Sequence, residues 1–150
     1  MRHVILLTGL LFVMAISASA QKSEIFKTSD GAIRGYDPVA YFNEGKPEKG
    51  NRAFQYKWND ADWYFVSKAN LDAFKGSPEK YAPQYGGYCA FGAADGEGHK
   101  ATTDPEQAWT ILNGKLYLNY NKNIKKEWIK DQAAFIEKAN KNWPKIKDKE

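Results

Sequence analysis

The feature that most limits how this chain can fold is its single cysteine, Cys89. One cysteine cannot form a disulfide within the chain, so buried apolar side chains alone must hold the fold together. A domain of this size buries roughly two-thirds of the surface of its unfolded chain, which is enough for an independent core. Tryptophan, tyrosine and phenylalanine make up 15% of the residues and can supply that core. We therefore expect one domain without covalent staples.

Residues 1–20 have the pattern of a signal peptide. Arg2 precedes an apolar run over residues 4–16, and the run is followed by alternating serine and alanine, the small-residue pattern that signal peptidases cleave. The run is too short for a bilayer span, which needs ~20 residues. We expect cleavage after Ala20, a periplasmic or secreted protein with no membrane span, and a flexible mature N-terminus over residues 21–32. An uncleaved anchor is the less favoured alternative.

The first half of the chain predicts a β-hairpin followed by short helices. RAFQYKW alternates aromatic and polar side chains, as a half-buried strand does, and NDAD and WYFVS complete an antiparallel hairpin over residues 54–67. Ser67 is placed to cap a helix over KANLDAFKG, which Gly76 ends. Pro78 can start another helical turn in SPEKYAP, and Pro83 ends it.

The last third predicts a second hairpin and a long helix. In AWTILNGKLYLNY, two apolar runs flank Asn113 and Gly114, which is the strongest short signal for a hairpin. Asn121 can cap a helix whose apolar side chains recur at helical spacing as far as Trp143. We expect an α+β fold in one domain over residues 33–145: a small antiparallel sheet of hairpins, short helices, and a long C-terminal amphipathic helix that packs on the sheet.

Five short stretches, in this order, resemble the YHS domain family. They are YDPVAYF, the aromatic hairpin that ends in WYFVS, the helix that carries Phe74, SPEKYAP and YGGYCA, and together they cover residues 33–120. The resemblance is closest to the exported bacterial branch, in which this domain makes up nearly the whole protein. It implies a small α+β domain of a kind described as a heavy-metal or copper-associated module, because related domains accompany metal-transporting ATPases.

The cysteines of the metal-associated family pattern are absent here. The position after Asp-Pro-Val is Ala40, and residues 65–70, after the hairpin, contain no thiol. Cys89 and His99 are the only thiol and imidazole of the mature chain, and sulfur suits Cu(I). We therefore predict a binding module for copper or another soft metal ion, with Cys89 as ligand and His99 as helper. A protein partner, or a second copy of the chain paired through Cys89, would complete the site.

Two other functions stay open. Tyr36, Tyr41, Tyr85 and Tyr88 crowd the motif segments, and with Asp37 beside them they could line a pocket for a small polar or cationic ligand, or for a protein partner. They could equally form the core, with the aspartate capping a turn. A thiol-dependent enzyme would use the same cysteine. We expect a binding protein and not an enzyme, because the sequence contains no phosphate loop, nucleophile elbow or third orienting residue.

The paired glycines before Cys89 predict a close approach. Gly86 and Gly87 suit an extended segment and remove side-chain bulk, which would let a ligand come near the sulfur or let another strand pass. The formal net charge of +4 is mild, and together with the expected export it does not favour nucleic acid as a partner.

Overall fold

The computed structural model describes residues 22–149. The predicted signal peptide and its cleavage site after Ala20 lie outside these residues. No helix within residues 22–149 combines the length and the apolarity that crossing a bilayer requires. The elements follow one another as β1 (Lys27–Thr28), β2 (Gly31–Ala32), η1 (Ile33–Gly35), α1 (Ala40–Asn43), β3 (Asn51–Trp58), β4 (Ala61–Phe65), α2 (Lys68–Gly76), α3 (Pro78–Tyr81), η2 (Gln84–Gly87), α4 (Ala90–Ala94), β5 (Trp109–Leu112), β6 (Lys115–Leu118), α5 (Lys122–Lys130) and α6 (Gln132–Ile146).

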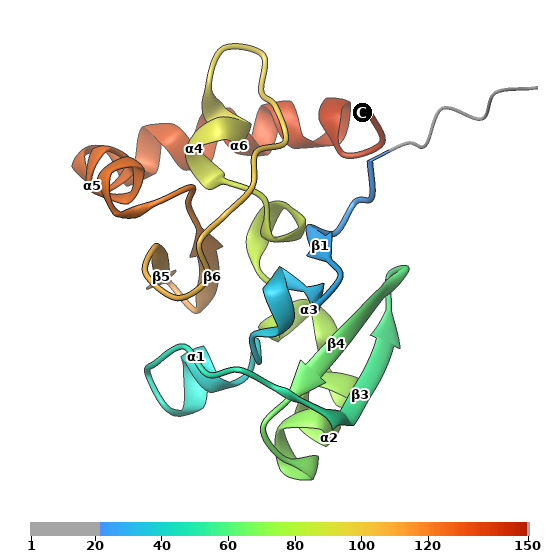
Figure 1. The fold of residues 1–150 in the computed structure, drawn as a ribbon. Helices are drawn as coiled ribbons and strands as arrows, with labels where there is room; N and C mark the ends of the chain where they lie inside the picture. Colours follow the sequence, from blue (N-terminus) through green and yellow to red (C-terminus); the bar gives the residue numbers. More distant parts are fainter. Residues whose placement is uncertain (1–21, 150) are drawn as a thin grey trace, which may run out of the picture.

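The fold is α+β, as the sequence predicts, and its strands form three antiparallel hairpins (Figure 1). β1 pairs with β2, β3 with β4, and β5 with β6. The turns after β3 and β5 each place two central residues at positive φ: Asn59 (49°) with Asp60 (57°), and Asn113 (51°) with Gly114 (72°). Such turns match the right-handed twist of a hairpin, so both hairpins are specified locally.

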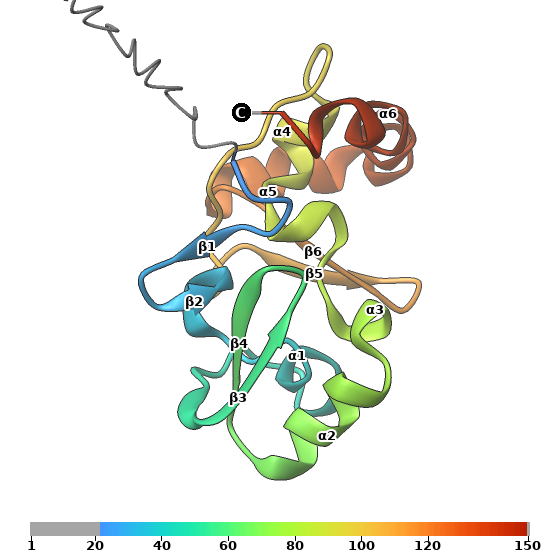
Figure 2. The same cartoon turned by 90° about the vertical axis from the view of Figure 1, so that its right-hand side faces the viewer.

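The elements form two ends with a middle layer between them (Figure 2). β3, β4 and α2 lie at one end, α4, α5 and α6 lie at the other, and the β1–β2 and β5–β6 hairpins lie between. Aromatic rings packed at tilted angles fill both ends. Phe74 of α2 packs against Trp63 with ring centroids 5.0 Å apart, and Trp128 of α5 packs against Tyr117 at 5.1 Å. Neither end depends on a disulfide, because the aromatic rings supply the buried area.

The N-terminal segment, predicted to be flexible, is packed against the body of the protein. Ile25 and Phe26 are 3% and 8% exposed and belong to the main hydrophobic core. The Phe26 N–H donates to the Gly86 carbonyl (2.8 Å), and β1 and β2 follow directly. The sequence did not predict this packing, because two apolar residues in a polar stretch form no periodic pattern. Their burial depends on a groove that distant segments form.

The predicted long C-terminal helix is two helices that meet at Asp131. This residue leaves the helical conformation (φ −151°, ψ 62°), so it ends α5, and its carboxylate accepts the Ala134 N–H (3.3 Å), so it caps α6. The apolar spacing continues across the break, which is why the sequence indicated one helix. Because the chain turns at Asp131, α6 lies against α4 and carries Trp143 to the side of the molecule where η2 lies.

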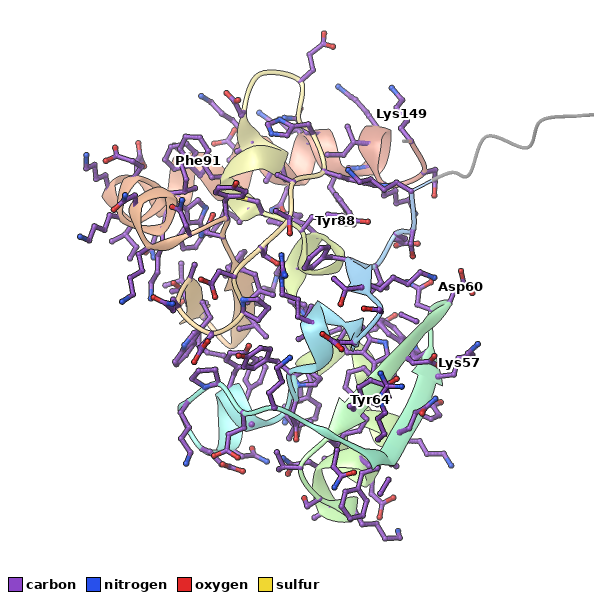
Figure 3. The ribbon with its side chains drawn as sticks, viewed as in Figure 1. Lys57, Asp60, Tyr64, Tyr88, Phe91 and Lys149 are labelled. Atoms are coloured by element: carbon purple, nitrogen blue, oxygen red, sulfur yellow. The ribbon has the colours of Figure 1, made fainter. Side chains whose placement is uncertain are left out.

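A buried lysine joins the two ends of the described chain. Lys100 is 7% exposed and donates to the carbonyls of Lys22 (2.9 Å) and Lys149 (2.7 Å). Figure 3 shows Lys149 near the point where the described chain begins. Burial lowers the pKa of Lys100, and the nearby Asp148 carboxylate acts in the opposite direction. The first residues of the described chain are thereby held at the edge where α6 ends.

Candidate functional site

Cys89 is a buried thiol at the start of α4. It is 2% exposed, and its Sγ accepts the Gly92 N–H (3.5 Å) and donates to Asn119 Oδ1 (3.6 Å). Asn119 is fully buried, and the same oxygen accepts the Phe91 N–H (3.0 Å). Burial raises the pKa of the Cys89 thiol, while the Gly92 N–H acts in the opposite direction. The sulfur is therefore a neutral, enclosed group in this structure.

His99 lies on the exposed loop that follows α4. Its backbone N–H donates to the Gly92 carbonyl (3.0 Å), and its imidazole Nε2 lies 3.2 Å from where a β-carbon on Gly92 would sit. The two residues predicted to hold a metal thus both contact Gly92. Within residues 22–149, no three His, Cys, Asp or Glu side chains form a group that could hold a metal ion. A metal at Cys89 would have to take further ligands from a partner, after the region opened.

We predict that Cys89 is nearly inert toward thiol reagents in the folded protein. With dithionitrobenzoate at pH 8, labelling should be slower than in urea-unfolded protein by on the order of a hundredfold, because the buried thiol is protonated and shielded. Absorbance at the wavelength of the released thiolate measures both rates on the same sample. A folded-state rate close to the unfolded one would show that the thiol is accessible, and would restore it as a site for metal or a partner.

Asp37 is fully buried and its carboxylate is occupied by protein donors. Oδ1 accepts the N–H groups of Val39 (2.8 Å) and Ala40 (3.3 Å), and Oδ2 accepts the Val66 N–H (2.9 Å) and Asn70 Nδ2 (2.8 Å). These four bonds tie the start of α1 to the end of β4 and to α2. The carboxylate serves the fold in this arrangement, as the turn-capping alternative proposed, and turns neither oxygen toward a cleft.

The four predicted tyrosines do not meet in one pocket. Tyr41 and Tyr88 are 1% and 3% exposed, and each hydroxyl donates to a backbone carbonyl at 2.7 Å. Burial raises the pKa of both phenols. Tyr36 and Tyr85 line two different clefts. Tyr85 is also buried, at 6% exposed, so the core alternative describes three of the four, and Tyr36 is partly buried.

The cleft that contains Tyr85 lies where the N-terminal segment, the β3–β4 turn, η2 and α6 converge. It has a volume of about 350 Å³, within the usual range of small-molecule sites. We call it the Trp58–Trp143 cleft. The lining residues that matter below are Glu24, Trp58, Glu79, Tyr85, Asn140 and Trp143.

Three aromatic rings in this cleft are fixed by packing behind them. Trp58 is half-buried and packs edge-on against Phe74, with centroids 5.7 Å apart. Trp143 is half-buried and packs against Tyr85 at 5.9 Å. The Tyr85 hydroxyl donates to Asn140 Oδ1 (3.0 Å), and the backbone at Tyr85 is left-handed (φ 56°). The rings are therefore preorganised, and those of Trp58 and Trp143 keep part of their surface open.

The charges in the Trp58–Trp143 cleft are opposite in sign to the net charge of the protein. Among the described residues that line it, Glu24 and Glu79 are the charged ones, and there is no lysine or arginine. Neither carboxylate is in an ion pair within residues 22–149. Burial holds the pKa of Tyr85 above its ordinary value, so the phenol is neutral. In a chain with a net charge of +4, this cleft is a local negative site.

Sequence reasoning missed the tryptophans and glutamates of this cleft. The alternation over residues 54–58 marked Trp58 as half-buried, and the helical spacing marked Trp143 as part of an apolar face, but neither pattern shows that the two approach one another. Glu24 and Glu79 belong to no motif. Their convergence depends on the packing of the N-terminal segment, which no local signal indicates.

Comparisons with protein families, with curated proteins and with solved structures found no match. The chemistry of the site therefore has to be judged from its own geometry. That geometry is a small, rigid, aromatic cleft with two carboxylates and neutral amides.

Proposed function

We propose that the protein is an exported binding module of the YHS type that takes a small organic cation in the Trp58–Trp143 cleft. The export and the family resemblance are supported by sequence alone. One structural observation supports the ligand class: two half-buried tryptophans and two glutamates line the same cleft, with no lysine or arginine among its described residues. A cation with an apolar body satisfies both features at once.

The physical reason lies in the combined effect of rings and carboxylates. The face of an indole or phenol ring attracts a cation by ~0.5–2 kcal/mol, most strongly when the cation is partly desolvated. Carboxylates add a longer-range attraction that is screened by salt at exposed sites. An anion would meet Glu24 and Glu79 without any compensating cation in the cleft. A neutral apolar molecule would gain only the contact area, so charge is the property that the cleft selects.

We predict that choline, used as the probe, binds with a Kd on the order of 1 mM or tighter at low salt, where 1 mM corresponds to about −4 kcal/mol. Its neutral isostere 3,3-dimethyl-1-butanol should bind at least about tenfold more weakly, because it keeps the shape and loses the charge. Isothermal titration calorimetry of the mature protein measures both. Raising the salt concentration should weaken choline binding and leave the alcohol unchanged.

Variants of the cleft locate the interaction. Glu79→Gln should weaken choline binding by about three- to tenfold, since it removes one carboxylate and keeps the side-chain shape. Glu97→Gln is the matched control, because Glu97 is exposed on the loop after α4 and does not line this cleft. Equal binding of choline and the alcohol would contradict the proposal, as would equal effects of the two variants.

The soft-metal function has less support from the described residues and stays a prediction. Cys89 is enclosed, and the structure groups no third ligand with Cys89 and His99. A thiol-dependent enzyme would need the same buried sulfur to be accessible. Both functions therefore depend on an opening of the region around α4 that the organic-cation function does not require.

A further inference from the structure

A second cleft, separate from the first, lies beside Tyr36. It has a volume of about 540 Å³ and shares no lining residue with the Trp58–Trp143 cleft. We call it the Tyr36 cleft. Its walls come from the segment between β1 and β3, the loop before β5, and the residues after β6. The residues used below are Asp30, Arg34, Tyr36, Lys49, Asp104 and Glu106.

The backbone that presents Arg34 to this cleft has an unusual conformation. Ile33 and Arg34 both have positive φ (43° and 57°), and Ile33 is fully buried. A β-branched residue rarely adopts this left-handed conformation, because its branched β-carbon crowds the backbone. Strained residues of this kind persist where the surrounding structure fixes them, and they cluster at functional sites. Here the strain fixes the direction in which Arg34 leaves the chain.

The guanidinium of Arg34 is oriented but only partly used. Its Nε donates to the Thr103 carbonyl (3.1 Å), and one terminal nitrogen donates to Thr102 Oγ1 (3.0 Å). Thr103 is itself held by a bond from its hydroxyl to the Gly87 carbonyl (2.8 Å). A guanidinium has five N–H donors, and among the described residues the other donors have no hydrogen-bond partner. Arg34 can therefore offer an oriented pair of N–H groups to a carboxylate.

A second cation lies beside Arg34. The Lys49 Nζ donates to the Arg34 carbonyl and lies over the Tyr36 ring, 4.8 Å from its centroid. Lys49 is exposed, so its ammonium keeps donors for a ligand. Lys49 is thus tied to the backbone of Arg34 and to the Tyr36 ring, and all three residues line the cleft.

Carboxylates line the same cleft. Asp104 Oδ1 accepts the N–H groups of Glu106 (3.1 Å) and Gln107 (3.0 Å), which fixes the turn that carries Glu106. Burial raises the pKa of Tyr36, and the adjacent Glu106 carboxylate adds to this effect as a neighbouring charge and hydrogen-bond acceptor. Asp30 lines the cleft as well. The acidic groups are therefore close enough to the Tyr36 ring to share a ligand with the cations beside it.

The opposite charges in this cleft do not neutralise one another. Within residues 22–149, none of Arg34, Lys49, Asp30, Asp104 and Glu106 has an oppositely charged side chain within 4.0 Å. Side chains of both signs that line one space without pairing leave room for a molecule that carries both complementary charges. An anion alone or a cation alone would meet like charges on one side.

We propose that the Tyr36 cleft binds a small zwitterion with a carboxylate and an ammonium group, of the free α-amino acid class. Arg34 and Lys49 hold the carboxylate, and Glu106 with Asp104 holds the ammonium. Tyr120, which is 50% exposed and lines the cleft, is available to contact the side chain of the ligand. This binding is independent of the organic-cation function, since the two clefts share no lining residue.

Calorimetry with matched probes tests the proposal. L-phenylalanine and L-glutamine represent an apolar and a polar side chain, and N-acetyl-L-phenylalanine and L-phenylalaninamide remove the ammonium and the carboxylate in turn. We expect at least one of the two free amino acids to bind. If phenylalanine binds, each of its two derivatives should bind at least about tenfold more weakly, because each loses one charged contact. Absence of heat with both amino acids overturns the proposal, and so does a derivative that binds as tightly as its parent.

Variants place the binding in this cleft and separate it from the first. Arg34→Gln and Glu106→Gln should each weaken amino-acid binding at least about fivefold, by removing one charged contact. Lys115→Gln, at the exposed first residue of β6, is the control and should change nothing. Glu106 is exposed, so its variant keeps the test valid if Arg34→Gln does not fold. If Glu106→Gln leaves amino-acid binding unchanged, the assignment of this binding to the Tyr36 cleft is overturned. This result does not depend on whether choline binds in the Trp58–Trp143 cleft.

Discussion

Gly86→Ala is expected to lower the free energy of unfolding by about 3 kcal/mol or more, from the combined cost of a left-handed alanine and a backbone clash. Gly86 has φ +63°, and a β-carbon there would lie 1.8 Å from the Glu24 carbonyl oxygen. The N-terminal segment would have to move away, which would break the bond between the Phe26 N–H and the Gly86 carbonyl. Urea unfolding monitored by tryptophan fluorescence measures the change in midpoint and slope.

Gly45→Ala is the matched control for this substitution. Gly45 has nearly the same backbone angle (φ +66°), but nothing lies within 4 Å of the position of its missing β-carbon. It should cost only the ~1–2 kcal/mol of the left-handed conformation. Equal losses for the two variants would mean that the N-terminal segment does not pack against Gly86. Because this segment contributes Glu24, the same result would remove one wall of the Trp58–Trp143 cleft.

Asp37→Ala is expected to destabilise the protein by about 3–5 kcal/mol, because it leaves four donors without their acceptor, several of them buried. Asp37→Asn should cost less than Asp37→Ala, since the amide keeps one acceptor oxygen. It should still destabilise the protein, because its N–H₂ group faces donors that then have no acceptor. Both changes can be read from the urea midpoint.

Asp72→Ala is the control for the aspartate series. Asp72 is exposed on α2 and forms an ion pair with Lys68 at 2.6 Å, so its removal should change stability by no more than about 0.5 kcal/mol. A stable Asp37→Ala variant would show that the carboxylate is not structural. Asp37 would then be restored as a ligand-binding residue, as the sequence first predicted.

Features that depend on neighbouring residues could be predicted from the sequence. The turn at Asn113 and Gly114 needs only two residues that tolerate positive φ. The caps at Ser67 and Asn121 each need one side-chain oxygen, which accepts an N–H three residues ahead (Asn70 at 3.1 Å and Ile124 at 2.9 Å). The β3–β4 and β5–β6 hairpins, the start of α2 and the start of α5 were therefore predicted correctly, whereas the β1–β2 hairpin was not.

Features that depend on distant packing could not be predicted. The close approach expected at the paired glycines is confirmed, but the segment is a left-handed 3-10 turn and is not extended. What approaches Gly86 is the Glu24 backbone, not a ligand of Cys89. The separation of Tyr36 from Tyr85 has the same cause. Both belong to motifs of one resemblance, yet the chain folds them into two different clefts.

The most direct test of the organic-cation site is a two-dimensional ¹H–¹⁵N NMR titration of the mature protein with choline. The chain has five tryptophans, and each indole N–H gives its own signal. If the cleft binds choline, the signals of Trp58 and Trp143 and the backbone amide of Tyr85 shift together along one binding curve. The indole of Trp128, which is fully buried behind Tyr117, stays in place. No shift at Trp58 and Trp143, or shifts confined to residues outside the cleft, would contradict the proposed function.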